Sequence, residues 1–278
     1  MLYIRMTLKY CVKNFPRLIL AAAPLVVAAA FLLNPVNVFV YGERFAPEGL
    51  DGFRHIFFWL FRREIVGRWY QYAIAFVLHF LTCCFLIAIV EKDFKVGRLS
   101  VRSPFYSINN TFPPVFKTYL VVFVAVLLFK SLLMCVLTLF STIFLSAGMS
   151  LFYSDVILAA AAFLLCFFFV ILLRTVFLTV GTMLLYGYGF RESYGVTLKF
   201  CVKKKGFYVA ASLALPLLTQ FALDYLMALT GAPDIVYYFV DALLLGLGTI
   251  YVCVTVMTAV YDITGIERRD MRPAYQTK

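Results

Sequence analysis

The sequence predicts an all-α, polytopic membrane protein with about six transmembrane helices. Of its 278 residues, 64% are hydrophobic and 14% are charged, whereas a soluble domain averages about 45–50% and about 25%. Its 30 Phe and 18 Tyr residues are more than a globular core of this size can bury, and the mean hydropathy is +0.93. The apolar residues also form long runs, close to the roughly 20 helical residues that cross a bilayer.

Six apolar runs are long enough to span a membrane. Helices are the suitable element because an open strand edge would leave backbone groups unsatisfied in lipid. In chain order the predicted spans are Leu18–Val40, Tyr70–Val90, Thr118–Ser146, Val156–Tyr186, Phe207–Leu229 and Ile235–Tyr261. The fourth run is the longest, so we expect it to tilt or to protrude from the membrane.

The basic residues predict the orientation. They gather in the N-terminal segment, after the second and fourth spans, and in the C-terminal tail, whereas the turns near Asp155 and Asp234 carry none. This distribution predicts a cell-membrane protein with both termini in the cytoplasm. The net charge of +11 is then explained by contact with anionic lipids, without a nucleic-acid partner.

The segment Tyr41–Trp69 differs from the other connections. It is long and nearly balanced in charge, with aromatic residues beside several arginines. This pattern is typical of a helix that lies in the outer interface of the membrane. The alternative is a re-entrant segment that lines a cavity.

A heptapeptide occurs twice in the chain. Residues 7–13 read TLKYCVK and residues 197–203 read TLKFCVK. Each copy precedes an apolar run that contains a proline next to a leucine, Pro24 in the first and Pro216 in the third. The point halfway along the sequence between the two copies falls close to residues 107–117, where we identify a diverged middle copy.

The chain is therefore predicted to be one transmembrane domain, residues 1–278, built from three units. The units cover about residues 1–100, 101–190 and 191–278, and each consists of a short amphipathic segment followed by a helical hairpin. Because each unit contains two spans, the three copies have the same topology and would be parallel repeats.

The repeated heptapeptide has the pattern of an amphipathic helix. If it is helical, Lys9 and Lys13 face the same way, as do Lys199 and Lys203, and an apolar stripe lies beside each pair. We expect helices on the inner leaflet, with the lysines toward anionic head groups. A docking site for a soluble partner is the alternative, because basic amphipathic helices also bind proteins.

Leu8, Lys9, Asn14 and Phe15 form a motif, Leu-Lys-x-x-x-x-Asn-Phe, that leads into the first hairpin. In this the chain resembles bacterial uncharacterised six-span membrane proteins, which are similar to the membrane domain fused to glycerophosphodiester phosphodiesterases. The third copy matches only the first two positions of the motif. The resemblance is architectural, covers most of the chain and includes no catalytic motif, so it implies no activity.

Ionisable residues inside membrane spans are the best candidates for a functional site. Here they are Lys130, Arg174, Asp224 and Asp241. Helix rise places the two basic residues at a depth of about 18 Å, near the middle of the membrane, and the two aspartates in the outer half. One hypothesis is a central cavity that attracts a lipid phosphate or a carboxylate, with the aspartates at its outer mouth and Gln220, Thr219 and Ser212 as further donors. Otherwise the basic residues snorkel to the inner interface or form structural ion pairs.

The cysteines, the histidine inside a span and the glycines are interpreted as structural. The seven cysteines show no metal-ligand spacing, so we expect neither disulfides nor a metal. His79 and Cys83 are one helical turn apart, but no further ligand is evident in the sequence. Gly246 and Gly248, with Ala242, are interpreted as one small-residue face for close helix packing.

Two functional hypotheses are favoured, because a third, an intramembrane enzyme acting on lipids, needs catalytic groups that the sequence does not show. The chain has no phosphate-binding loop, HExxH or GxSxG motif, so we expect neither an enzyme nor a cofactor. The first hypothesis is a membrane component that assembles with partner proteins or a second copy, or that organises anionic lipid. The alternative is a transporter or permease-like subunit for an anionic or amphipathic solute, centred on Lys130 and Arg174.

Overall fold

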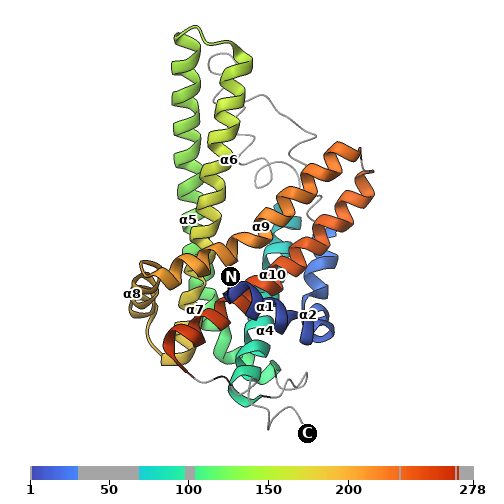
Figure 1. Cartoon of the computed structure of the whole chain (residues 1–278), viewed down its shortest axis with the longest axis vertical. Coiled ribbons are helices and arrows are strands. Elements are labelled where there is room, and N and C mark those ends of the chain that lie inside the picture. Colours follow the sequence, from blue (N-terminus) through green and yellow to red (C-terminus); the bar gives the residue numbers. More distant parts are fainter. Residues whose placement is uncertain (1, 31–68, 98–103, 232, 267, 269–278) are drawn as a thin grey trace.

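The computed structural model describes residues 2–30, 69–97, 104–231, 233–266 and 268, and all regular structure in this part of the chain is helical (Figure 1). Five helices are long and apolar enough to cross a membrane, and a sixth span is present if the bent pair α1–α2 counts as one. The predicted all-α, multi-pass class is confirmed. The predicted interfacial segment, Tyr41–Trp69, lies outside the described residues except for Trp69, which begins α4.

The chain begins with two helices that meet nearly at a right angle. α1 (Leu2–Lys13) and α2 (Phe15–Ala28) are inclined at 89°. Asn14 interrupts them, and its side chain donates a hydrogen bond to the carbonyl of Tyr10 at 3.2 Å. Pro16 lies in the first turn of α2, where a missing N–H costs nothing. The basic α1 therefore runs across the direction of the first span.

The next two helices form a closely packed pair. α4 (Trp69–Val96) covers the predicted second span, but α5 (Pro104–Ser146) begins well before the predicted third span and has 43 residues. The diverged middle copy is thus continuous with its span, without the break seen after α1. Aromatic packing explains the continuity, because Phe112 and Phe116 lie one turn apart and both contact Phe80 of α4.

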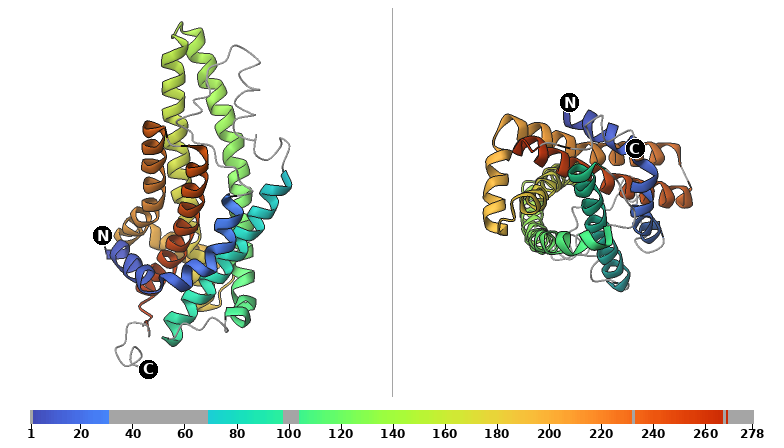
Figure 2. Two further views of the ribbon diagram at one scale, coloured as in Figure 1. Left: turned by 90° about the vertical axis from the view of Figure 1, so that its right-hand side faces the viewer. Right: turned by 90° about the horizontal axis from the view of Figure 1, so that it is seen from below.

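The remaining helices complete two more hairpins. In chain order they are α6 (Leu151–Val176), α7 (Leu178–Tyr186), α8 (Phe190–Cys201), α9 (Lys204–Thr230) and α10 (Asp234–Thr264). The predicted fourth span is therefore divided into α6 and α7 by a break at Phe177. Figure 1 shows the α5–α6 hairpin extending beyond the ends of α9 and α10. Figure 2 shows α8 running crosswise to α9.

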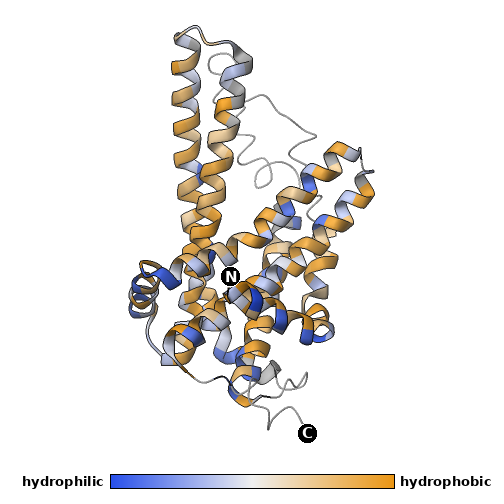
Figure 3. Cartoon of the chain, viewed as in Figure 1, coloured by the Kyte–Doolittle hydropathy of each residue, from blue (hydrophilic) through white to orange (hydrophobic). Residues whose placement is uncertain are grey.

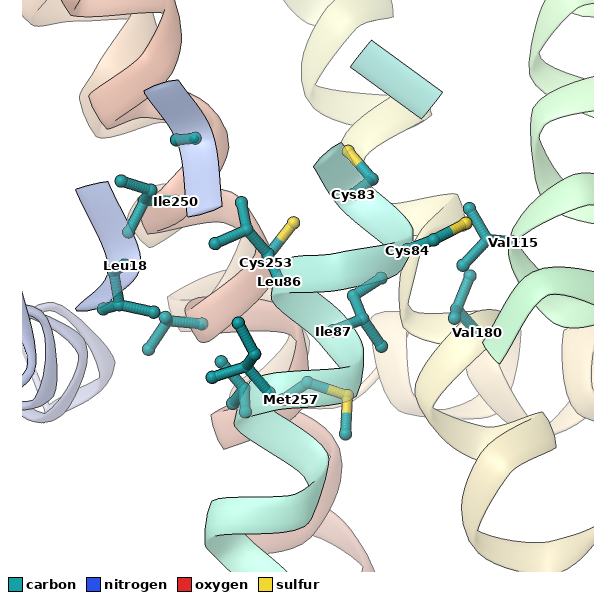
Figure 4. Packing of buried hydrophobic residues seen from close by; sticks show 14 of the residues in the cluster. Leu18, Cys83, Cys84, Leu86, Ile87, Val115, Val180, Ile250, Cys253 and Met257 are labelled. Carbon is teal, nitrogen blue, oxygen red and sulfur yellow. The ribbon is translucent and has the colours of Figure 1, made fainter. Parts of the chain in front are cut away.

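α10 is the central helix of the bundle and packs against α1, α2, α4, α7 and α9. Within its apolar stretch 67% of the residues are buried, against 11% for α5. Leu18, Ile87, Cys253 and Met257 join α2, α4 and α10 in the core (Figure 4). By contrast, hydrophobic residues cover the outside of α5 and α6 (Figure 3), where they suit contact with lipid.

The three leading segments dock in a regular way. α1 packs on α10, α8 on α7, and the start of α5 on α4, so each contacts the second span of the preceding predicted unit. A buried threonine lies in each segment: Thr7 accepts a hydrogen bond from Thr255 at 3.1 Å, Thr111 donates to the Cys84 carbonyl at 3.4 Å, and Thr197 is buried in α8. Three equivalent units would give this cyclic order of contacts, although the repeat itself stays a prediction.

Candidate functional site

A cavity of about 160 Å³ lies at the centre of the bundle, between α4, α6, α9 and α10. Most of its wall is apolar. Its polar lining consists of Arg174, His79, Gln220 and Thr249, together with the thiols of Cys83 and Cys253, which come from α4 and α10 (Figure 4). Arg174 is the only permanently charged side chain among these lining residues. A single cation in an apolar wall is the arrangement expected of an anion-binding pocket.

Arg174 enters the cavity from the last turn of α6, just before the break at Phe177. Its Nη1 atom donates a hydrogen bond to the Leu213 carbonyl of α9 at 2.7 Å. The bond lies next to Pro216, which has no N–H and interrupts the backbone hydrogen bonds of α9. The missing N–H leaves the Ser212 carbonyl, four residues earlier, without a helical donor, and Arg174 binds the next carbonyl in the same turn.

The guanidinium of Arg174 has donors left over. It carries five N–H groups, and within the described residues its one hydrogen bond is to Leu213 and no carboxylate forms an ion pair with it. A charge inside a membrane is costly unless something compensates for it. Arg174 is therefore positioned to receive an anionic group in the cavity.

The two predicted aspartates lie together near one end of the cavity. Gln220, which lines the cavity from α9, donates through Nε2 to Oδ1 of Asp241 on α10 at 2.7 Å. Asp224 lies one turn beyond Gln220 on α9 and is close enough to Asp241 for electrostatic interaction. The predicted orientation places this end toward the outer face. The structure thus brings Asp224, Asp241 and Gln220 together beside the cavity that Arg174 lines.

Lys130, which was predicted to share a site with Arg174, lies elsewhere. It is half-buried on α5 and interacts electrostatically with the thiol of Cys166 on α6. It is not among the residues that line the cavity. Helix rise predicts the depth of a residue but not the face on which it lies, and Lys130 faces the partner helix of its own hairpin.

His79 belongs to a buried polar cluster in the cavity wall. Its Nδ1 lies 2.6 Å from the hydroxyl of Tyr119, and its Nε2 lies 3.4 Å from the hydroxyl of Thr249. The Tyr119 hydroxyl also donates to Sγ of Cys83 at 3.1 Å. No group of three candidate metal ligands occurs within the described ranges. No sequence pattern indicates Tyr119 or Thr249, because their contacts with His79 depend on packing between helices far apart in the chain.

The four predicted interfacial lysines form a second candidate surface. Lys9 and Lys13 on α1 are exposed, and so are Lys199 in the last turn of α8 and Lys203 just after that helix. Exposed apolar side chains lie beside them, namely Leu8, Val12, Leu198 and Val202. Exposed lysines next to exposed aliphatic residues are typical of a helix at a membrane surface.

α1 is held to the bundle by its other face. The Tyr3 hydroxyl donates to Oδ2 of Asp262 on α10 at 2.6 Å, and Nζ of Lys205 lies 3.1 Å from the same oxygen. Thr7 and Tyr10 are buried on this face. The inward side of α1 is therefore specified by tertiary contacts, which leaves the lysines to point outward.

Comparison with known proteins adds no assignment: no protein family, no curated protein and no solved structure matches this chain. The resemblance to membrane domains fused to glycerophosphodiester phosphodiesterases therefore stays a prediction from its motif residues.

Proposed function

We propose that this protein is a non-enzymatic integral membrane protein that binds the anionic group of a lipid or amphipathic solute at Arg174. The observation that carries the proposal is the position of this guanidinium: it lines an apolar cavity and has no ion-pair partner in the described part of the chain. Because an ionised side chain inside a membrane is expensive, an anionic ligand would offset part of that cost.

The size of the cavity limits what can bind. At about 160 Å³ it is smaller than the roughly 300–1,000 Å³ of pockets for drug-sized ligands. A carboxylate or a phosphate head group fits this space, and the apolar part of the molecule would extend beyond it. Storage, organisation and transport of such a molecule all begin with this binding step.

Replacing Arg174 with leucine is expected to weaken the binding of anionic lipid. A hydrogen bond to a charged group contributes about 1.5–3 kcal/mol, so the affinity should fall roughly ten- to a hundredfold. Lys130→Leu is the matched control, because it also removes one intramembrane charge but lies outside the cavity. Native mass spectrometry of the purified protein would measure the bound lipid. Equal lipid retention by both variants would contradict the proposal.

A second function, contact with the anionic inner leaflet, is supported by the lysines exposed on α1 and α8. Each Lys near an anionic surface contributes about 1 kcal/mol. Their position would let the protein gather anionic lipid around its inner end, with both termini in the cytoplasm. Assembly with a partner protein or a second copy stays a prediction.

Changing Lys9, Lys13, Lys199 and Lys203 together to glutamine is expected to reduce the enrichment of anionic lipid around the protein in mixed nanodiscs. The difference from wild type should shrink at high salt, because salt screens exposed charges. Lys95→Gln is a control, since Lys95 is paired with Glu91. If the fourfold variant kept the full enrichment at low salt, this second function would be rejected.

A further inference from the structure

His79 lines the same cavity as Arg174 and has a hydroxyl group at each of its ring nitrogens. The two residues come from α4 and α6 and share one cavity of about 160 Å³, so a ligand group that fills it meets both walls. Nδ1 of His79 lies 2.6 Å from the hydroxyl of Tyr119, and Nε2 lies 3.4 Å from the hydroxyl of Thr249. The imidazole is therefore part of the cavity wall and is surrounded by groups that can both donate and accept.

These hydroxyls suit the neutral and the protonated imidazole. A neutral imidazole accepts at one nitrogen and donates at the other, whereas a protonated one donates at both. The neutral form is satisfied when Tyr119 donates to Nδ1 and Nε2 donates to Thr249, whose own proton goes to the Leu245 carbonyl at 2.8 Å. On protonation Nδ1 would donate to Tyr119, and the Tyr119 proton has a second acceptor in place, Sγ of Cys83 at 3.1 Å. His79 can thus take up a proton while each of these buried groups keeps a partner.

The positive charge of Arg174 opposes protonation of His79 in the empty cavity. The titratable or charged groups around the imidazole come from four helices: Cys83 of α4, Tyr119 of α5, Arg174 of α6 and Cys253 of α10. α9 contributes only Pro216 and Gln220 to the lining, and no carboxylate is among the described residues there. Two cations in an apolar wall are costly. An anion bound at Arg174 reverses this, because it attracts the protonated imidazole.

We propose that the cavity takes up a proton together with its anion, and that His79 carries this proton. The inference rests on the proposed function, because it takes Arg174 as the anion-binding residue. Histidine is the side chain that most readily changes its charge near neutral pH. By linkage, protonation strengthens anion binding by the same factor by which the anion favours protonation. The proton is therefore a second ligand of the cavity.

The affinity for the anion should fall as the pH rises. At low pH the cavity wall holds two cations, Arg174 and the protonated His79, whereas at high pH Arg174 remains alone. Between about pH 5 and about pH 8, where histidine side chains change charge, we expect the affinity to decrease roughly tenfold. This lies within the range of about 5–150-fold that is typical of coupling between two ligands.

Calorimetric titration of the detergent-solubilised full chain tests this inference. The probe is dihexanoyl phosphatidylglycerol, whose phosphodiester keeps a single charge over this pH range, and each titration is repeated in two buffers that differ in their enthalpy of ionisation. The difference in heat gives the number of protons taken up. We expect uptake of up to one proton per bound lipid, and binding without uptake at any pH would overturn the inference.

A second probe distinguishes a lipid from a water-soluble anion. Dimethyl phosphate carries the same phosphodiester charge without acyl chains. If it binds, the ligand is a soluble anion; if only the lipid binds, the ligand is a membrane lipid. Proton uptake must accompany whichever probe binds, and its absence would contradict the role of His79.

Three variants locate the proton and separate the possible failures. His79→Gln keeps a hydrogen-bonding side chain that does not titrate, so proton uptake and the pH dependence should both disappear. Cys83→Ser is the matched control and should keep both; the reverse result would place the proton on the thiol and reject the inference. Arg174→Gln should weaken binding at every pH, and unchanged binding would reject the proposed function. Weakened binding in Arg174→Gln without proton uptake in wild type would reject the present inference alone.

Nitrogen-15 NMR of histidine-labelled protein provides a second test if His79→Gln does not fold. The chain has two histidines, so His55→Gln leaves His79 as the single labelled imidazole. Saturation with the lipid at a fixed pH should increase the protonated fraction of this imidazole. An unchanged signal on saturation would show that His79 does not take up the proton.

Discussion

Replacing Gly206 with alanine is expected to destabilise the junction between α8 and α9 by about 3 kcal/mol, the upper end of the usual cost of overpacking. A Cβ at this position would lie 2.5 Å from the Cα and the carbonyl oxygen of Cys201 and from the carbonyl oxygen of Phe200. All three are backbone atoms, so no side chain can rotate to make room. α8 would have to move away from α9, and with it the basic surface that carries Lys199 and Lys203.

Gly195→Ala is the matched control for this prediction. Gly195 lies in α8, and nothing surrounds the position that its Cβ would take within 4 Å. Alanine is favoured over glycine in a helix by about 1 kcal/mol, so this variant should be at least as stable as wild type. The melting temperatures of the two variants would be compared by heating each in detergent and measuring the remaining folded fraction by size-exclusion chromatography. Similar melting temperatures for both variants would show that the junction tolerates a side chain.

Replacing Gly246 with alanine is expected to separate α10 from α2 and to cost about 1–3 kcal/mol. The added Cβ would overlap Cγ2 of Val26. Valine in a helix strongly prefers one rotamer, so the methyl group cannot simply turn aside. Because α10 is the central helix of the bundle, a shift here would also disturb its packing against α4 and α9.

Gly248→Ala provides the control on the same helix. Its Cβ would lie 3.5 Å from Cβ of Pro216, an ordinary van der Waals contact, so stability should be unchanged or slightly higher. The double variant Val26→Ala/Gly246→Ala should regain part of the stability lost in Gly246→Ala. A melting temperature for Gly246→Ala equal to that of Gly248→Ala would reject the close approach of α2 and α10.

The glycines also show where sequence analysis reached its limit. Gly246 and Gly248 were interpreted as one small-residue face, and both do allow close packing. However, residues two apart on a helix point in different directions, and these two contact α2 and α9 respectively. Composition and spacing identify the residue type that close packing needs. Only the tertiary arrangement identifies the partner helix.

The helices show the same contrast between features that the sequence predicts and features that depend on tertiary packing. The long apolar runs were enough to predict five of the spans, because crossing a bilayer is a matter of length and hydropathy. The first predicted span, Leu18–Val40, extends beyond the described residues. The break at Phe177 and the continuity of α5 through Pro113 and Pro114 could not be predicted, since both depend on what the helices pack against. For the candidate site, helix rise predicts a depth in the membrane for Lys130 and Arg174, and this stays a prediction. Which of them lines the cavity could not be predicted.

The contact between the two ends of the chain has a consequence for biosynthesis. Tyr3 and Thr7 precede their partners Asp262 and Thr255 by 259 and 248 positions. During synthesis α1 must therefore stay at the membrane surface, without these partners, until α10 has been made. Docking of α1 is then a late step relative to the synthesis of the helices between them, and a chain truncated before α10 would leave α1 undocked.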